Sequence, residues 1–391
     1  MVQRYKACRP VAPLVLTLTA NTIAAAKHRL ARQWEGSHIR CTDIGSSLCR
    51  VNRRIATLVA ALVPVVVLGV AGTVVTVPFA ALGPGPTYNT LGDADGRPVV
   101  QIDGTDVDPT TGHLNMTTVA VRDQLNIFEA FGFWASGRQG LVPREEVYPP
   151  DKSKEEVQQS NQADFEQSED SAELAALRHL GYPVVLTVGT VAPDGPASGL
   201  LNEGDRVVSI DGAPIDTVTG VRDVVSAHSP GDVIVVRVST DGVERDESVT
   251  LGARPDDAEK GYLGVTPTEE PDVPFDVTFN LADVGGPSAG LMFSLAVVDK
   301  LSPGELSNGE FVAGTGTIAD DGAVGPIGGI PYKLIAARDA GATTFLVPSQ
   351  NCDEASANTP DGLRLVKVDS LDGAIDALES IGAGGDAPSC S

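Results

Sequence analysis

Residues 285–290 read Gly285-Gly286-Pro287-Ser288-Ala289-Gly290, and an apolar run that predicts a helix follows them directly. A hydroxyl group here lies at a glycine-rich turn, where the unpaired N–H groups of a helix N-terminus favour a developing negative charge. Serine before a helix is most often a simple N-cap, which satisfies one of those N–H groups. The segment alone therefore leaves two interpretations of Ser288, a helix cap and a nucleophile.

A second segment, 45 positions further along (333 − 288), separates these interpretations. It reads Gly328-Gly329-Ile330-Pro331-Tyr332-Lys333 and opens another helix. Burial lowers the pKa of a lysine toward the neutral amine that a general base must be, whereas the alternative is a lysine whose ammonium group reaches water. A helix cap needs no matched lysine, so the pair predicts a serine nucleophile, Ser288, with Lys333 as its base.

Both segments resemble the proteolytic domain of the Lon protease family. In that family a serine in a G-P-S-A-G turn is the nucleophile, and a lysine in a following G-G-[LI]-x-x-K-[LV]-x-A-A segment is the base. Residues 313–318 and 322–327 resemble the strand–turn–strand between the two motifs. The resemblance covers roughly residues 260–380, and the whole chain resembles the PDZ-containing, membrane-anchored Lon-like proteases of bacteria.

The resemblance implies acyl transfer by a Ser–Lys dyad. Backbone groups at Gly286, Pro287 and Ala289 are the candidates to stabilise the oxyanion, because they lie near the start of the helix. Thr315 and Thr317 are candidates for substrate contact, although they are interpreted equally well as β-branched strand residues.

Residues 183–252 resemble a PDZ domain of the kind associated with bacterial proteases. Such domains add a peptide strand to a sheet edge and hold its terminal carboxylate on backbone N–H groups. The best positional candidates for that loop are Gly181, Tyr182 and Val184, although Pro183 between them removes one donor. A domain that only spaces or docks the catalytic unit is the alternative. The similar segment 261–265 is interpreted as the first strand of the protease domain.

The net charge of −24 is distributed unevenly. Residues 1–54 contain ten Lys/Arg and two acidic residues, which leaves 18 basic and 50 acidic residues, or −32, in the remainder. An acidic body repels phosphate backbones, so we expect no nucleic-acid partner. Residues 55–82 carry no charge and are long enough to cross ~30 Å of hydrocarbon. The basic flank before them predicts a cytoplasmic N-terminus and an extracytoplasmic catalytic body at the cell membrane; a cleaved signal peptide, with 79–81 as a weak cleavage site, is the rival.

The cysteines fall into two groups. Cys8, Cys41 and Cys49 lie in residues 1–50, which we interpret as upstream sequence or a cytoplasmic tail, with translation beginning at position 51. Only Cys352 and Cys390 follow the apolar span. Export favours a disulfide between them, and two free thiols are the alternative.

Two further stretches are distinctive. Residues 124–138 are rich in aromatic side chains, which predicts either a helix packed on its neighbours or one lying on the bilayer; core packing is favoured because aromatic clusters are usually buried. Residues 151–180 are polar over most of their length and predict a long exposed helix that acts as a spacer.

These patterns predict an α+β multidomain protein. Its expected parts are a basic segment (1–54), a transmembrane helix (55–82), a mixed α/β membrane-proximal region (83–180), a PDZ domain (181–255), a protease domain of α/β type (260–380) and a flexible tail (381–391).

The five histidines have no spacing suited to a triad or metal site, and no G-x-x-x-x-G-K-[ST] loop occurs in the chain. We therefore expect an ATP-independent serine endopeptidase without metal or cofactor, cleaving exported or membrane-associated proteins recruited in part by the PDZ domain. The family resemblance implies a homo-oligomeric ring. The alternative is a proteolytically inactive PDZ scaffold or chaperone at the cell envelope.

Overall fold

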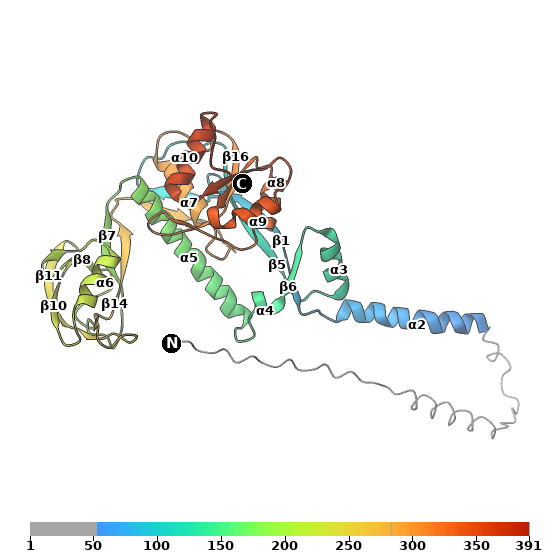
Figure 1. Cartoon of the computed structure of the whole chain (residues 1–391), viewed down its shortest axis with the longest axis horizontal. Helices are drawn as coiled ribbons and strands as arrows, with labels where there is room; N and C mark the ends of the chain where they lie inside the picture. Colours follow the sequence, from blue (N-terminus) through green and yellow to red (C-terminus); the bar gives the residue numbers. More distant parts are fainter. Residues whose placement is uncertain (1–52, 283, 391) are drawn as a thin grey trace, which may run out of the picture. The chain divides into compact units, whose positions relative to one another are not determined.

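The computed structural model describes residues 53–282 and 284–390 (Figure 1). Contacts divide the chain within helix α2 into two units, residues 1–68 and 69–391. The expectations for residues 1–50, including the later translation start and the three cysteines, lie outside the described residues.

Helix α2 (Arg53–Val74) contains the apolar segment. Within the described residues, Ile55–Val74 is the single helix long and apolar enough to cross a membrane, with 20 residues and a mean hydropathy of 2.5. The predicted span of 55–82 was too long at its C-terminal end. Strand β1 (Phe79–Asn89) begins at Phe79, and Ala80 and Ala81 are buried in it. Small apolar residues fit a buried strand as readily as a membrane helix, so composition alone did not place this boundary.

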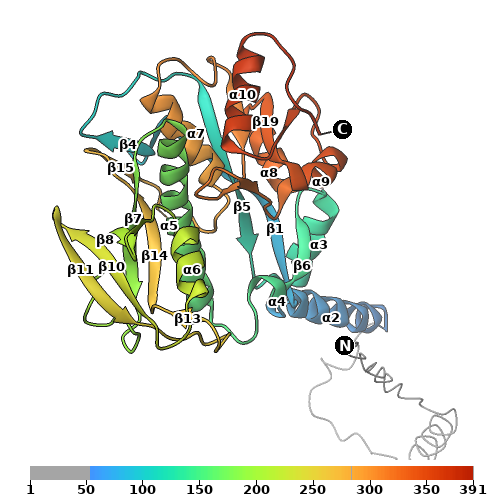
Figure 2. The same cartoon turned by 60° about the vertical axis from the view of Figure 1, so that its left-hand side comes forward.

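The first sheet has six strands in the order β20-β19-β16-β5-β1-β6 (Figures 1 and 2). Strand β1 is antiparallel to β5 and β6, whereas β16 is parallel to β5 and β19, and β19 is parallel to β20. Besides β1, the strands are β5 (His113–Arg122), β6 (Gly140–Pro143), β16 (Phe311–Gly314), β19 (Thr344–Pro348) and β20 (Arg364–Val368).

This sheet corrects the expectation that residues 83–180 form a separate region before the protease domain. Three strands from each segment share one sheet and meet where β16 pairs with β5, because β16 is buried and needs a hydrogen-bonded neighbour on each side. Strand β5 supplies one of those neighbours and β19 the other.

Helices cover both faces of the sheet. Phe345, Val347 and Leu365 contribute to a core with α8 (Ile330–Ala340) and α9 (Cys352–Ala357). Leu346 and Val366 point the other way, as the alternation of a strand requires, and join a core that includes residues of α5 (Lys154–His179), α7 (Gly290–Leu301) and α10 (Leu371–Gly382).

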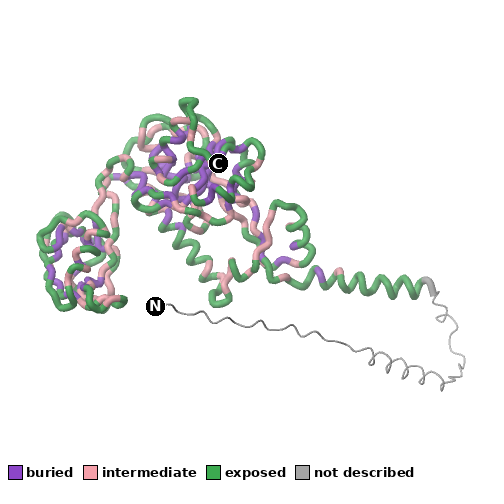
Figure 3. The backbone as a smooth tube through the Cα atoms, viewed as in Figure 1, coloured by how far each residue is buried: buried purple, intermediate pink, exposed green. Residues whose placement is uncertain are grey.

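Helix α5 is more than the exposed spacer that was predicted. Its first half is largely exposed (Figure 3). Phe165, Ser168 and Ala172 are buried, however, as are four consecutive residues near its end, 174–177. The helix packs along α7. Polar residues dominate its composition and obscured the narrow apolar stripe that faces the protease core.

A second sheet has the order β11-β10-β8-β7-β14, with β9 paired to β8. Its elements are β7 (Val184–Val191), β8 (Arg206–Ile210), β9 (Ala213–Pro214), α6 (Val218–Ala227), β10 (Val233–Thr240), β11 (Val243–Thr250) and β14 (Val265–Pro271). The interpretation of 261–265 as the start of the protease domain was wrong, since β14 pairs antiparallel with β7 from Val265 to Pro271. Leu263 and Val265 pack into the core of this second sheet, which explains the pairing.

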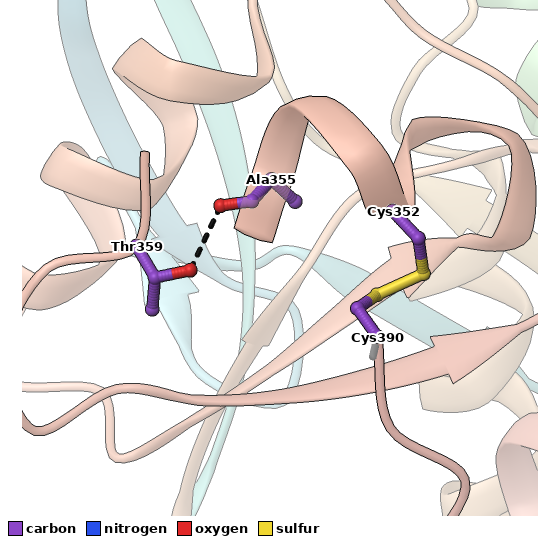
Figure 4. The surroundings of a disulfide bond; sticks show 4 residues. All are labelled: Cys352, Ala355, Thr359 and Cys390. Carbon is purple, nitrogen blue, oxygen red and sulfur yellow. Dashed lines mark hydrogen bonds between the residues drawn. A yellow bond between two sulfur atoms is a disulfide. The ribbon is translucent and has the colours of Figure 1, made fainter. Parts of the chain in front are cut away.

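The remaining elements are short. They are β2 (Asp93–Ala94) with β3 (Arg97–Pro98), β4 (Val100–Asp103) with β15 (Asp276–Phe279), β12 (Gly252–Ala253) with β13 (Gly261–Tyr262), β17 (Thr317–Ile318) with β18 (Val324–Gly325), and the helices α3 (Ile127–Ser136), α4 (Arg144–Val147) and η1 (Ser349–Asn351). Cys352 on α9 and Cys390 near the C-terminus form a disulfide, which ties the predicted flexible tail to the sheet (Figure 4).

The aromatic stretch forms α3, and the expectation of core packing was wrong for most of it. Ala130 is buried and Phe133 packs with it, but Phe128, Phe131 and Trp134 are exposed. A ten-residue helix buries one face only, and in α3 the buried residue is Ala130, which has a small side chain.

Candidate active site

The turn before α7 presents Ser288. Gly286 has a φ of +87°, a conformation that glycine adopts without strain, and α7 begins at Gly290. The helix cap is Ala289 and has no side-chain hydrogen bond, so Ser288 is not used as a conventional N-cap. A Cβ on Gly290 would lie 2.6 Å from Cγ2 of Ile318, which explains why this position is a glycine.

Lys333 lies in the first turns of α8 and reaches Ser288. The helix starts after Gly329, whose φ is +72°, and the lysine side chain is only 2% exposed. Its Nζ is 2.7 Å from Ser288 Oγ and 2.8 Å from Thr315 Oγ1. The two residues that were predicted to act together are thus in hydrogen-bond contact.

The charge state of Lys333 follows from its surroundings. Among the described residues no carboxylate lies within ion-pair distance of its Nζ, while burial removes water from the ammonium form. Burial lowers the pKa of Lys333 from 10.5 to about 7. A neutral amine, which can accept a proton, is therefore well populated near neutral pH.

Thr315 organises this contact. Its hydroxyl donates to the carbonyl oxygen of Ser288 at 3.0 Å, which uses its only proton. The same oxygen must then accept from Nζ of Lys333, so the amine donates toward Thr315 and directs its lone pair elsewhere. Ser288 Oγ is the other group within hydrogen-bond distance of Nζ, and a neutral amine can accept its proton. Thr315 thus contacts both Ser288 and Lys333, and its predicted contact with substrate stays a prediction.

The structure leaves fewer backbone N–H donors for the oxyanion than the sequence predicted. Pro287 has no N–H and cannot donate. The N–H of Gly286 donates to the carbonyl oxygen of Asn161 on α5 at 2.7 Å, so it is already engaged. The N–H groups of Ser288 and Ala289 have no acceptor among the described residues. Of the three predicted positions, only Ala289 therefore retains a free donor, and Ser288 itself adds one.

Helix α5 contacts the turn that carries Ser288 at two places that the sequence interpretation missed. Besides the Asn161 carbonyl, the hydroxyl of Ser168 donates to the carbonyl oxygen of Pro287 at 3.1 Å. The spacing of Phe165, Ser168 and Ala172 on one helix face was the available signal, since these positions recur at i, i+3 and i+7.

Ser288 and Lys333 open into a pocket of about 450 Å³. Strands β1 and β5 form its opposite wall, and the chain between residues 284 and 289 forms the near one. Neither Thr315 nor Thr317 lines this pocket; Thr317 lies in β17, paired with Gly325. The wall residues, also missed, are Pro86, Tyr88, Met116, Thr118, Val119 and Ala120.

A second pocket, of about 610 Å³, lies between α6 and the edge strand β14. It is lined by Val218, Val221 and Val225 of α6 and by residues 262–267. This is the segment that was assigned to the protease domain.

The predicted peptide-binding residues lie elsewhere. Tyr182 packs its ring edge-on against Phe275, with centroids 5.4 Å apart, and Val184 pairs with Pro271. Gly181 is in the turn that ends α5. Residues 181–184 precede β7, whereas the second pocket is lined by residues 262–267 near the start of β14, so the predicted role of 181–184 in peptide binding stays a prediction.

Comparison with known proteins finds matches to two parts of the chain, one that contains Ser288 and Lys333 and one that contains most of the second sheet. A family model described as the Lon protease (S16) C-terminal proteolytic domain matches residues 280–379, and a PDZ domain model matches residues 159–251. Lon protease of Heliobacterium modesticaldum is 40% identical over 90 residues, 22% of this chain and 11% of that protein. Lon protease 2 of Bacillus subtilis is 28% identical over 204 residues, 50% of this chain and 33% of that protein.

The match thus spans only about a tenth to a third of these relatives' own length. Among solved structures, the PDZ domain of the SdrC-like protein from Listeria monocytogenes is 21% identical, covering 22% of this chain and 87% of that one with a TM-score of 0.20. The family models and the named relatives together show that this chain carries the proteolytic domain of the Lon protease family, a serine peptidase domain, together with a PDZ domain.

Proposed function

We propose that this chain is a serine endopeptidase that uses Ser288 as nucleophile and Lys333 as general base. The observation that carries the proposal is the contact of Nζ with Oγ at 2.7 Å, from a lysine that is buried without an ion-pair partner in the described chain. Burial supplies the neutral amine, and the contact supplies the path for the proton.

The reaction proceeds in two halves. The proton of Ser288 Oγ moves to Lys333 Nζ as Oγ bonds to the substrate carbonyl carbon, and the N–H groups of Ser288 and Ala289 stabilise the oxyanion. Collapse breaks the peptide C–N bond, and Lys333 returns the proton to the leaving amine. Water then gives a proton to Lys333 as its oxygen bonds to the acyl carbon. The bond from that carbon to Oγ breaks, Lys333 returns the proton to Ser288 Oγ, and the product leaves as a carboxylic acid.

The substrate presentation follows from the second pocket. The backbone N–H groups of Leu263 and Gly264 have no acceptor among the described residues, and Gly264 has a φ of +81°. Free donors at the start of an edge strand suit the terminal carboxylate of a peptide that adds to β14. We therefore assign recruitment of C-terminal or flexible protein segments to the groove between α6 and β14.

The apolar helix anchors the protein in a membrane as a single span. Its 20 apolar residues match the hydrocarbon thickness, and the basic residues before it favour a cytoplasmic N-terminus with an extracytoplasmic catalytic body. Removal as a signal peptide at 79–81 would cut strand β1, whose Ala80 and Ala81 are buried. A retained anchor is consistent with an intact sheet. Substrates are then exported or membrane-associated proteins.

The proposal includes ATP independence and assembly. The 391 residues contain no phosphate-binding loop of the G-x-x-x-x-G-K-[ST] type, so this chain has no means of its own to couple cleavage to ATP. The similarity to Lon proteolytic domains supports a homo-oligomeric ring, which native mass spectrometry of the solubilised protein tests.

The test uses the full-length chain in detergent micelles, as wild type, Ser288→Ala and Lys333→Ala. Each is incubated with an unfolded protein without nucleotide, and fragments are identified by mass spectrometry. Cleavage by the wild type alone is the expected result. Equal cleavage by all three identifies a contaminating protease, and no cleavage by any folded variant favours an inactive scaffold or chaperone.

A further inference from the structure

Helix α3 carries an apolar face that the other described residues leave largely exposed. Ile127, Phe128, Phe131 and Trp134 are 49%, 54%, 63% and 67% exposed. At 100° per residue these four side chains, with Ala135, fall within one arc of about 120° on the helix. The opposite side holds Ala130 and Phe133, which pack on β1 and β6. One face of the helix therefore packs against the protein, and another face is apolar and exposed.

We propose that α3 lies in the interface of the lipid bilayer and inserts these aromatic side chains among the lipids. The inference rests on the proposed membrane anchor and adds a second point of membrane contact. It concerns a part of the chain that is distant in sequence from the catalytic residues and from the PDZ domain.

The chain itself places α3 at the end of the apolar helix. Thr76 forms a β-bridge with Asn126, the N-cap of α3, and the N–H of Val77 donates to the carbonyl of Leu125 at 2.8 Å. Val74, the last residue of α2, is thus only two residues from this bridge, roughly 7 Å of extended chain. A bilayer crossed by α2 therefore has its surface at the first turn of α3.

The two apolar surfaces are continuous. A Cβ on Gly72 would lie 2.6 Å from the ring of Phe128, so this ring rests on the last turn of α2. Val74 and Val75 beside it are also exposed. A surface that continues from a lipid-facing helix onto α3 fits lipid as its occupant, since one apolar solvent then covers both.

The charges of α3 agree with an interfacial position. Glu129 is its single charged residue, and its carboxylate accepts from the N–H of Asn126 in a capping box, away from the apolar arc. The Arg122 guanidinium lies 5.5 Å from the centroid of the Phe133 ring, on the protein-facing side. Tryptophan and phenylalanine are the residues preferred at the boundary of headgroups and acyl chains, about 5–10 Å deep for such a helix.

The experiment uses Trp134 as its own probe. The chain contains two tryptophans, so Trp34→Phe leaves Trp134 as the single emitter in the full-length protein. The protein is reconstituted into phosphatidylcholine vesicles whose acyl chains are brominated either near the headgroup or near the terminal methyl group. We expect blue-shifted Trp134 emission and strong quenching, greater with the shallow bromines than with the deep ones.

Two further probes, both in a Trp34→Phe/Trp134→Phe background, make the outcome specific. Ser136→Trp lies on the opposite arc of the same helix and should be quenched weakly. Leu62→Trp lies in the middle of the apolar helix and should be quenched best by the deep bromines, which reports on the anchor alone.

The possible negative results distinguish a failure of the α3 inference from a failure of the membrane anchor. Quenching of Leu62→Trp without quenching of Trp134 overturns the inference and leaves the anchor standing. Absence of quenching at both positions overturns both. Blue-shifted Trp134 emission without quenching by bromines indicates a protein partner or a second copy on α3, and equal quenching of Ser136→Trp shows that no particular face is inserted; either result overturns the inference.

Discussion

The pH dependence of peptide cleavage is the property that follows most directly from the burial of Lys333. The perturbation is the assay pH, from 6 to 10. With a pKa of about 7, roughly one lysine in eleven is neutral at pH 6 and ten in eleven at pH 8. Since only the neutral amine accepts the proton of Ser288, kcat/KM should rise about tenfold from pH 6 to 8 and then level off.

An ordinary lysine gives a different curve. With a pKa near 10.4, the neutral fraction rises about a hundredfold from pH 6 to 8 and about seventyfold more by pH 10. The assay measures kcat/KM of the full-length protein on a fluorogenic peptide whose own groups do not titrate in this range. A rate that continues to rise tenfold per pH unit above pH 8, or that falls from pH 6 to 9 in a folded protein, would refute the reasoning.

Lys300 offers a matched control for this experiment. It lies in the last turn of α7, and burial lowers its pKa as well, although it has no contact with Ser288. Lys300→Met should therefore leave the shape of the pH profile unchanged, whereas Lys333→Arg should abolish activity at every pH because arginine stays protonated.

Three further predictions concern the same residues and α5. Thr315→Val removes the acceptor of Lys333 Nζ and should lower kcat by about ten- to a hundredfold, the equivalent of a buried hydrogen bond worth 1–3 kcal/mol, with Thr315→Ser restoring most of it in steady-state kinetics. Lys333→Met should be inactive yet more stable at pH 7. The lowered pKa of Lys333 implies that the lysine costs the folded wild type up to about 5 kcal/mol of stability at pH 7. The variant loses two hydrogen bonds, which reduces its gain in stability by about 1 kcal/mol for each bond. The difference in stability should disappear by pH 10.5, as measured by thermal unfolding. Glu169→Gln should raise Tm at pH 8 but not at pH 5, because burial, then Asp170 and Glu166, raise the pKa of Glu169 to about 7 and the folded protein loses stability between pH 4.5 and 7.

Each of these three predictions has a result that would contradict it. A Thr315→Val enzyme with unchanged kcat would mean that Lys333 needs no positioning. A Lys333→Met protein that is less stable than wild type at pH 7 would mean that the lysine is charged in the folded state. A Tm difference for Glu169→Gln that is the same at pH 5 and pH 8 would place that carboxylate in water.

The contact between Ser288 and Lys333 was predicted because its signal is local. Ser288 lies in the glycine-rich turn before α7, and Lys333 lies in the first turn of α8 after Gly328 and Gly329. These short segments specify their own backbone, so their meeting was foreseeable from order and spacing. The pairing of β5 with β16 was not, because it joins residues about 200 positions apart and depends on which buried strand needs a neighbour.

Other errors have similarly physical causes. Residues 181–184 and 261–265 both combine glycine, tyrosine and valine, and only the pairing of β14 with β7 decides which segment lies beside α6. Helix α5 is polar overall, so its buried stripe at Phe165 and Ser168 was outweighed by its composition. In α3, aromatic content predicted burial, but composition does not reveal which face the rest of the chain covers.

Acylation of Ser288 tests the central claim most directly. Wild type, Lys333→Met and Lys300→Met are mixed with an activated peptide ester at pH 8, quenched with acid within the first turnovers, and mapped by mass spectrometry. The account predicts an acyl group on Ser288 in the wild type and in Lys300→Met, and none in Lys333→Met. An acyl group on Ser288 at an equal rate without Lys333, or on another residue in the wild type, would contradict it.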